Sequence, residues 1–245
     1  MNNLDLIILV VLFLVTSIVG VVTGSNSLIT VPVMFQFGID EKRAIATNMF
    51  GLTFMAIGAT IPFIRQGKIE PRKLTPLIAL TVVGSALGAL LVGYITNHSI
   101  RLIVSIAMIA VVLFTLVRSD PGKSAQFPTV GYIVTFLLAV YGGLYSGGYV
   151  TILTAAFVAF MGMDYAESVG STKLVNVFSS GVATLVFMQQ RLVDYSLGAI
   201  LAVTMFVGAY VGAHYAAKMN EVWLRRIFLA TVVLLAIKTL YDLAA

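Results

Sequence analysis

The sequence predicts an all-α, polytopic membrane protein made of two homologous repeats, each a broken-helix hairpin followed by three transmembrane helices. Of its 245 residues, 60% are hydrophobic and 10% are charged, and the mean hydropathy is +1.03. Soluble domains carry about 25% charged residues, so a soluble core does not explain this composition. The apolar residues also form runs of helix length, and the second half repeats the pattern of the first. We expect about 8 to 10 helices.

The apolar runs define the predicted helices, because a helix needs about 20 apolar residues to cross a bilayer. They cover residues 4–22, 28–37, 44–64, 74–95 and 100–117 in the first half, and 130–140, 150–160, 169–188, 197–217 and 222–243 in the second. A run of ten or eleven residues rises only about 15–17 Å, half of a hydrocarbon core about 30 Å thick. The short runs are therefore predicted to belong to two hairpins, residues 4–37 and 130–160, each broken inside the membrane.

An internal repeat appears when residues 38–116 are placed on residues 162–240, a shift of 124 residues without a gap. The two segments are identical at 16 of 79 positions. The shift also carries Gly24 onto Gly148, so the glycine-rich hairpin breaks match as well. We predict a first transmembrane repeat at residues 1–118, a linker at 119–128 and a second repeat at 129–245, forming one integral-membrane domain. Internal repeats around a shared midplane site are common in secondary transporters.

The relative orientation of the repeats has two readings. A hairpin plus three crossings in each repeat, five helices and five, makes the repeats inverted and puts nine Lys and Arg residues on one side and five on the other. Four crossings in each repeat make them parallel, with a split of eight to six. The positive-inside rule favours inversion, and both readings stay open from the sequence.

The two hairpin breaks are the first candidate for a binding site. Each leaves backbone N–H groups at the start of the returning helix, where a partial positive charge attracts anions. Irregular backbone at membrane depth is tolerated only against protein or a watery cavity, although both breaks could instead be flexible turns in water. The candidate substrate-binding residues at the breaks are Ser25, Asn26, Ser27, Gly148, Tyr149 and Thr151.

Polar residues near the starts of the next helices are the second candidate. Thr47 and Asn48 match Ser171 and Thr172 across the repeat, and all four are candidate pore-lining residues. Hydroxyl groups in membrane helices also bond to carbonyls of their own helix, which is the alternative role for them.

Lys173 is the one basic residue predicted to lie inside a span. Burying an unpaired charge there costs about 2.5–3.5 kcal/mol, so this side chain should face a cavity or a partner unless it reaches the interface. Asn176, one turn further along, is predicted to share that cavity. A positive charge at this place predicts a small anionic substrate.

Other residue types restrict the function. The chain has no cysteine and two histidines, so we expect no metal site and no cofactor. We predict no carboxylate deep in a span, no Ser/His/Asp set and no phosphate loop, so we expect no enzyme, while the coupling ion stays open. The net charge of +5 lies in short loops, which indicates contact with membrane lipids rather than nucleic acid.

Two pairs of glycines in matching helices predict close helix contacts. Gly84 and Gly88 correspond to Gly208 and Gly212, and small residues four apart let two helices approach closely in lipid. We expect these pairs to pack helices inside the fold; a contact in a homodimer is the alternative.

The chain resembles a known family in both halves. The stretch GSNSLITVPVM from Gly24 to Met34, followed by Gly38 and the segment AIATN ending at Asn48, resembles the signature of the TauE/SafE family of sulfite and organosulfonate exporters. Residues 142–148, Gly162 and residues 170–172 are similar to the repeated copy of that signature. The stretch from Ser25 to Ser27 stands where the family often has glycines.

The resemblance implies a multi-pass protein of the bacterial or archaeal inner membrane that transports sulfur-containing anions. We therefore predict a secondary transporter that exports sulfite, sulfoacetate or a related organosulfonate. A carrier or channel for another small anion, such as a carboxylate, is the alternative, and a membrane scaffold without a substrate is a further one.

Overall fold

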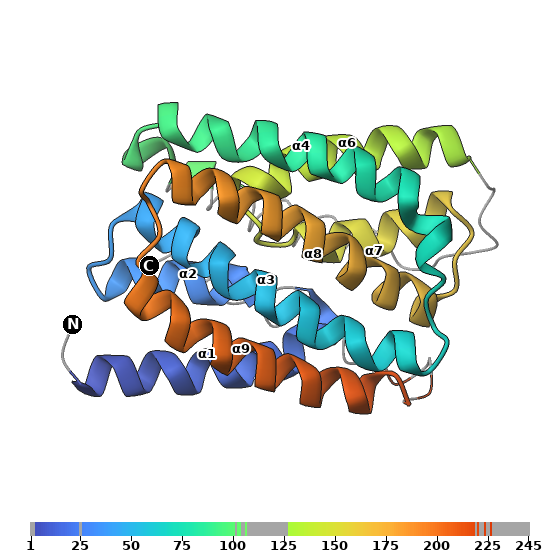
Figure 1. Cartoon of the computed structure of the whole chain (residues 1–245), viewed down its shortest axis with the longest axis horizontal. Helices are drawn as coiled ribbons and strands as arrows, with labels where there is room; N and C mark the ends of the chain where they lie inside the picture. Colours follow the sequence, from blue (N-terminus) through green and yellow to red (C-terminus); the bar gives the residue numbers. More distant parts are fainter. Residues whose placement is uncertain are drawn as a thin grey trace.

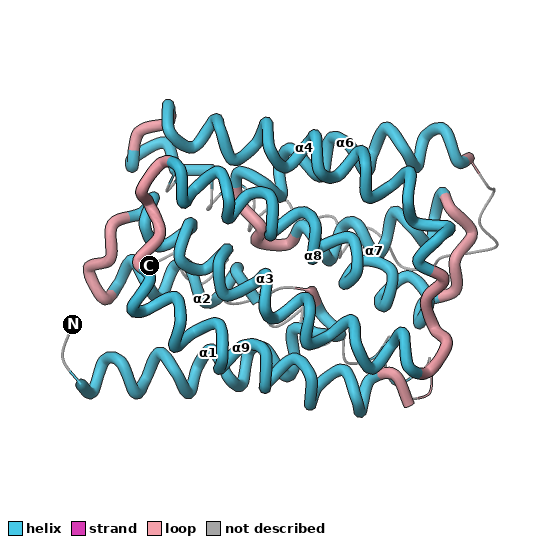
Figure 2. The backbone as a smooth tube through the Cα atoms, in the orientation of Figure 1, coloured by secondary structure: helices cyan, strands magenta, loops and turns pink. Residues whose placement is uncertain are grey.

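All regular elements in the described part of the chain are helices (Figure 1). The computed structural model describes residues 3–24, 26–100, 102–103, 106, 127–218, 220, 223 and 226. Ser25, most of the predicted linker 119–128 and most of the predicted helices 100–117 and 222–243 lie outside these residues. Short loops join the helices within each half (Figure 2).

The helices agree with the apolar runs of the sequence. The first half contains α1 Asn3–Thr23, α2 Asn26–Gln36, α3 Glu41–Arg65, a short 3-10 helix η1 Pro71–Leu74, and α4 Thr75–Tyr94; the second contains α6 Pro128–Leu144, α7 Tyr149–Phe160, α8 Tyr165–Gln189 and α9 Tyr195–Ala216. Five of the described helices are long and apolar enough to cross a bilayer. α2 and α7, with 11 and 12 residues, are too short to cross alone. The predicted all-α, multi-pass architecture is confirmed at this level.

Helix α6 is longer than its predicted run. The apolar run predicts a helix over residues 130–140, whereas the helix begins at Pro128 and continues through Gly142 and Gly143 to Leu144. Gly143 lies against the backbone of Ser85 on α4, where a Cβ atom would come within 2.2 Å of the Ser85 carbonyl oxygen. The two glycines interrupt the apolar run, so the sequence gives no sign that the helix continues. In the structure they allow α6 to pack closely on α4, and this contact stabilises the last turn of the helix.

Matching aspartates begin the long helices α3 and α8. The Asp40 carboxylate accepts a hydrogen bond from the Arg43 amide at 3.1 Å, and the Asp164 carboxylate accepts one from the Glu167 amide at 2.7 Å. Each side chain satisfies an amide that has no partner within its own helix. These acidic residues therefore cap the two helices at exposed positions.

The paired glycines pack helices within the chain. A Cβ atom at Gly88 would lie 1.9 Å from the Val140 carbonyl oxygen on α6, and one at Gly212 would lie 2.3 Å from the Ile18 carbonyl oxygen on α1. α4 of the first half thus packs on α6 of the second, and α9 of the second half packs on α1 of the first. The predicted role of the motifs in packing inside the fold is confirmed.

The matching helices α3 and α8 run in opposite directions beside each other. Phe63, near the end of α3, contacts Gly170 near the start of α8, and the hydroxyls of Thr53 and Thr184 lie 3.2 Å apart further along. In Figure 1, α1 begins at the left edge of the molecule and α6, its counterpart, begins at the right edge. These two pairs of corresponding helices, α1 with α6 and α3 with α8, therefore point in opposite directions.

Candidate functional site

The two hairpin breaks meet each other inside the bundle. α1 and α2 are joined through Gly24, and α6 and α7 through the segment that ends at Gly148; both glycines have positive φ, +68° and +76°. Glycine adopts this conformation without steric cost. A Cβ atom at Gly24 would lie 2.8 Å from the Thr151 amide nitrogen, so the first break packs directly on the first turn of α7.

Three hydrogen bonds between described residues join the two hairpins at this contact. The Ser27 and Ser146 hydroxyl oxygens lie 2.8 Å apart. The Tyr145 hydroxyl donates to the Ser27 carbonyl at 3.0 Å, and the Thr151 hydroxyl donates to the Thr23 carbonyl at 2.7 Å. All three bonds are buried, and each joins one half of the chain to the other.

Next to the breaks, each half has an equivalent threonine on its short helix that bonds to the long helix following it. The Thr30 hydroxyl donates to the Asn48 side-chain oxygen at 2.9 Å, and the Asn48 amide donates to the Ser27 hydroxyl at 2.9 Å. Across the shift of 124 residues, the Thr154 and Thr172 hydroxyls lie 3.1 Å apart. The short helices α2 and α7 are thus each tied to the long helix that follows.

A small cavity lies between the breaks and the helices α3 and α8. Its lining residues are Gly20, Gly24, Asn26, Ser27, Leu52, Met55, Ala56, Ala59, Ser146, Val150, Lys173 and Asn176. About 20 Å³ of its interior is open to the centres of water molecules, which is room for about one or two waters. The cavity is therefore closed to a larger solute in this conformation.

Lys173 is the charged residue of this lining. Its side chain is 4% exposed, and its ammonium nitrogen lies 3.1 Å from the Gly20 carbonyl oxygen in the last turn of α1. In the described part of the chain the ion pair is Lys73 with Glu70, and neither residue lines the cavity. Lys173 is thus a buried cation held by a carbonyl, with no described carboxylate in salt-bridge contact.

The structure brings four of the predicted binding residues together in the cavity: Asn26, Ser27, Lys173 and Asn176. Asn48 contacts Ser27 from outside the lining, and Gly148 and Thr151 lie at the contact between the breaks.

Other predicted residues point elsewhere. Thr47 accepts a hydrogen bond from the Asp194 amide at 3.0 Å, at the start of α9. Thr172 donates to the Val169 carbonyl of its own helix at 2.9 Å, which is the alternative role foreseen for such hydroxyls. Ser171 is buried outside the lining, and Ser25 lies outside the described residues.

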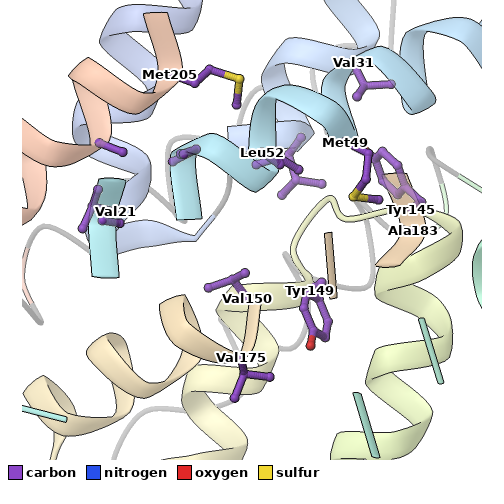
Figure 3. Close-up of a cluster of buried hydrophobic side chains, with 14 of the residues drawn as sticks. Val21, Val31, Met49, Leu52, Tyr145, Tyr149, Val150, Val175, Ala183 and Met205 are labelled. Atoms are coloured by element: carbon purple, nitrogen blue, oxygen red, sulfur yellow. The ribbon is translucent and has the colours of Figure 1, made fainter. Parts of the chain in front are cut away.

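Tyr149 begins α7 but sends its hydroxyl away from the cavity. Its ring packs on Gly142, and Figure 3 shows the hydroxyl pointing away from Leu52 and Met49 of α3. The hydroxyl lies beside Thr81 and Ser179, without hydrogen-bond geometry to a described residue. It belongs to a second buried polar cluster between α4, α6, α7 and α8.

Sequence reasoning missed several residues of this region. Thr30 and Thr154 are identical across the repeat, so extending the internal comparison upstream to the hairpins would have found them. In the same comparison Ser146 is aligned with Val22, so no identity between the halves marks Ser146. The hydroxyls of Ser85 and Ser179 lie 2.7 Å apart. In the sequence comparison these serines are aligned with an alanine and a methionine, so the repeat does not mark them either.

Comparisons with known proteins agree with this picture. The family model described as Sulfite exporter TauE/SafE matches residues 8–239. The chain is 28% identical over 244 residues to the "Probable membrane transporter protein YfcA" of Escherichia coli strain K12, covering 96% of this chain and 91% of that protein. It is 26% identical over 250 residues to the "Probable membrane transporter protein ORF9" of Sinorhizobium sp, covering 99% and 96%. No solved structure gives a significant match.

The apolar helices, the broken hairpins and these relatives define a multi-pass membrane transporter. The match over nearly the whole length shows which kind: the chain belongs to the sulfite exporter TauE/SafE family.

Proposed function

We propose that this protein exports a small sulfur-containing anion, such as sulfite, sulfoacetate or a related organosulfonate, across the cell inner membrane. The observation that carries the proposal is the buried Lys173 ammonium in a cavity between two hairpin breaks. Intramembrane cations are rare and mark substrate pathways. The family description adds sulfite as the substrate class.

The cavity has the groups that an oxyanion requires. Lys173 supplies a positive charge with three donors, and Asn176 together with the hydroxyls of Ser27 and Ser146 supplies neutral donors. Hydrogen bonds from charged donors to oxyanions are about twice as strong as neutral ones. The proposed substrate position is therefore between Lys173 and the two breaks.

We further propose that the two halves are inverted repeats that rock against each other. The opposite directions of α3 and α8 support inversion, as do the matched bonds of Thr30 and Thr154. The cavity is closed to about the size of one or two waters, so passage requires the cross-hairpin bond of Ser27 to Ser146 to separate. Alternating access around a fixed midplane site is the expected mechanism.

Ligand-induced thermal stabilisation tests the proposal, because a ligand that binds the native state raises its melting temperature. The purified protein is heated with sulfite, sulfoacetate, taurine, thiosulfate or simple dicarboxylates. We expect a selective shift with a sulfur anion and no shift in Lys173→Met, which places in α8 the residue that α3 carries at the equivalent position. Lys68→Met, which removes a lysine from an exposed loop, is the matched control and keeps the shift.

A shift with carboxylates alone would replace the substrate class, leaving a carrier for another small anion. An unchanged shift in Lys173→Met would remove Lys173 from the site. The lack of a shift with every anion would favour a membrane scaffold.

A further inference from the structure

The charge in the cavity is that of a single ammonium group. Among the described lining residues Lys173 is the basic one, and the others are uncharged. An anion with one negative charge neutralises this group, whereas a second negative charge would stay uncompensated at membrane depth. Such charges are expensive in the hydrocarbon region.

The helix ends at the breaks do not change this balance. Each break brings the carbonyl end of one helix beside the amide end of the next: α1 ends at Thr23 and α2 begins at Asn26, while α6 ends at Leu144 and α7 begins at Tyr149. Helix ends carry partial charges of about −0.5 and +0.5, so the two ends at each break nearly cancel. The carbonyl end of α1 is used by Lys173 itself, through Gly20.

Asn26 adds a second requirement. Its side chain is 3% exposed and lines the cavity, and its amide nitrogen donates to the Met55 sulfur at 3.2 Å. The reverse amide orientation would set the side-chain oxygen against the sulfur, acceptor against acceptor. In this orientation no described residue donates to the Asn26 side-chain oxygen, and a buried acceptor is expected to have a donor.

We propose that the cavity selects a singly charged oxyanion that also carries a hydrogen-bond donor. The anionic group binds Lys173, and the donor binds the side-chain oxygen of Asn26. The inference rests on the proposed function and narrows its substrate class. It favours protonated sulfite over the sulfite dianion, and a hydroxyl-bearing sulfonate over sulfoacetate, which carries two negative charges.

Three sulfonates separate the two requirements. Hydroxyethanesulfonate has one charge and a donor, ethanesulfonate has one charge and no donor, and sulfoacetate has two charges. Their binding to the full-length protein in lipid nanodiscs is measured by calorimetry at neutral pH. We expect hydroxyethanesulfonate to bind roughly tenfold tighter than ethanesulfonate. We expect sulfoacetate to bind about fiftyfold or more weaker than hydroxyethanesulfonate.

The Asn26→Leu variant tests the donor assignment. It should lose the preference for hydroxyethanesulfonate, so that the ratio of the two dissociation constants, for ethanesulfonate and hydroxyethanesulfonate, falls to about one. The comparison of the three ligands on the wild-type protein decides the proposal even where this variant does not fold.

The outcomes distinguish this inference from the proposed function. Equal binding of sulfoacetate and hydroxyethanesulfonate would overturn the charge requirement. Equal binding of ethanesulfonate and hydroxyethanesulfonate would overturn the donor requirement. In both cases a sulfonate still binds and the proposed function stands. Failure of all three sulfonates, and of sulfite, would refute the proposed function and this inference together.

Discussion

The two long helices that face the cavity, α3 and α8, occupy corresponding positions in the two halves but carry opposite chemistry. The pairs related by the shift of 124 residues are Met49 and Lys173, Leu52 and Asn176, Met55 and Ser179, and Ala56 and Ser180. Of these residues, Leu52, Met55 and Ala56 of α3 and Lys173 and Asn176 of α8 line the cavity, so its α3 wall is apolar and its α8 wall is polar. Ser179 and Ser180 lie outside the lining and bond to Ser85 and to the Asn176 carbonyl. Lys173 and Asn176 are therefore the binding candidates on α8.

What the halves share is the packing. Both begin their long helix with a capping aspartate, both break their hairpin at a glycine with positive φ, and both tie the short helix to the long one through a threonine. The repeat thus preserves the shape of the bundle, while of the two long helices only α8 contributes polar residues to the described cavity lining.

The glycine contacts between helices should show the largest effects. Gly88→Ala places a Cβ atom 1.9 Å from the Val140 carbonyl oxygen, so α4 and α6 must separate. We expect a loss of about 3 kcal/mol or more in the free energy of unfolding. Gly212→Ala, with its contact at 2.3 Å, should lose somewhat less. Chemical denaturation in detergent measures both.

Gly181→Ala is the control for this pair. Its Cβ atom would meet only the Thr53 methyl group, at 3.8 Å, in the described part of the chain. Alanine is the better helix former by about 1 kcal/mol, so this variant should be neutral or slightly stabilised. Equal losses in all three variants would contradict the assignment of close helix contacts.

Replacing the equivalent threonines Thr30 and Thr154 should lower the free energy of unfolding by less than the glycine substitutions do, and by different amounts. Thr30→Val leaves the buried Asn48 side-chain oxygen without its donor, at a cost of about 1–3 kcal/mol. Thr154→Val costs less, about 1 kcal/mol, because Thr172 still bonds to the Val169 carbonyl. Melting temperatures of the two isosteric variants give the comparison, and a larger loss in Thr154→Val would reverse it.

Substitutions in the loops that follow α3 and α8 should have the smallest effect on stability. Gly67 and Arg191 are related by the shift and both have positive φ, +65° and +57°. Arg191→Gly should stabilise the protein by about 0.5 kcal/mol, and Gly67→Ala should destabilise it by about 1 kcal/mol. Opposite signs in the two melting temperatures are the expected result; a destabilised Arg191→Gly would show that this arginine makes contacts that offset its strain.

Much of the fold could be predicted from the sequence because the bilayer constrains it. Long apolar runs must be helices, and short ones must turn back, so α2 and α7 were expected as the short arms of two hairpins. The end of α6 was missed, because its two glycines interrupt the apolar run while serving the contact with α4.

The site was predicted in part, for a different physical reason. Lys173 is recognisable because a lone charge inside a span needs a cavity, and Asn176 follows from helical spacing. Thr47 and Asn48 are adjacent and look equivalent, but helix rotation sends Thr47 to the Asp194 amide and Asn48 to Ser27. Ser146 depends on how the two breaks meet, which no local pattern encodes.

Substrate protection of a single cysteine tests most directly the claim that the anion binds between the hairpin breaks. The chain has no native cysteine, so Ser146→Cys can be labelled alone by a charged, water-soluble thiol reagent when the two breaks separate and open the cavity. Ser196→Cys, at an exposed position near the start of α9, is the control. We predict that hydroxyethanesulfonate slows labelling at residue 146 and leaves labelling at residue 196 unchanged. Labelling at residue 146 that no sulfur anion slows would contradict the account.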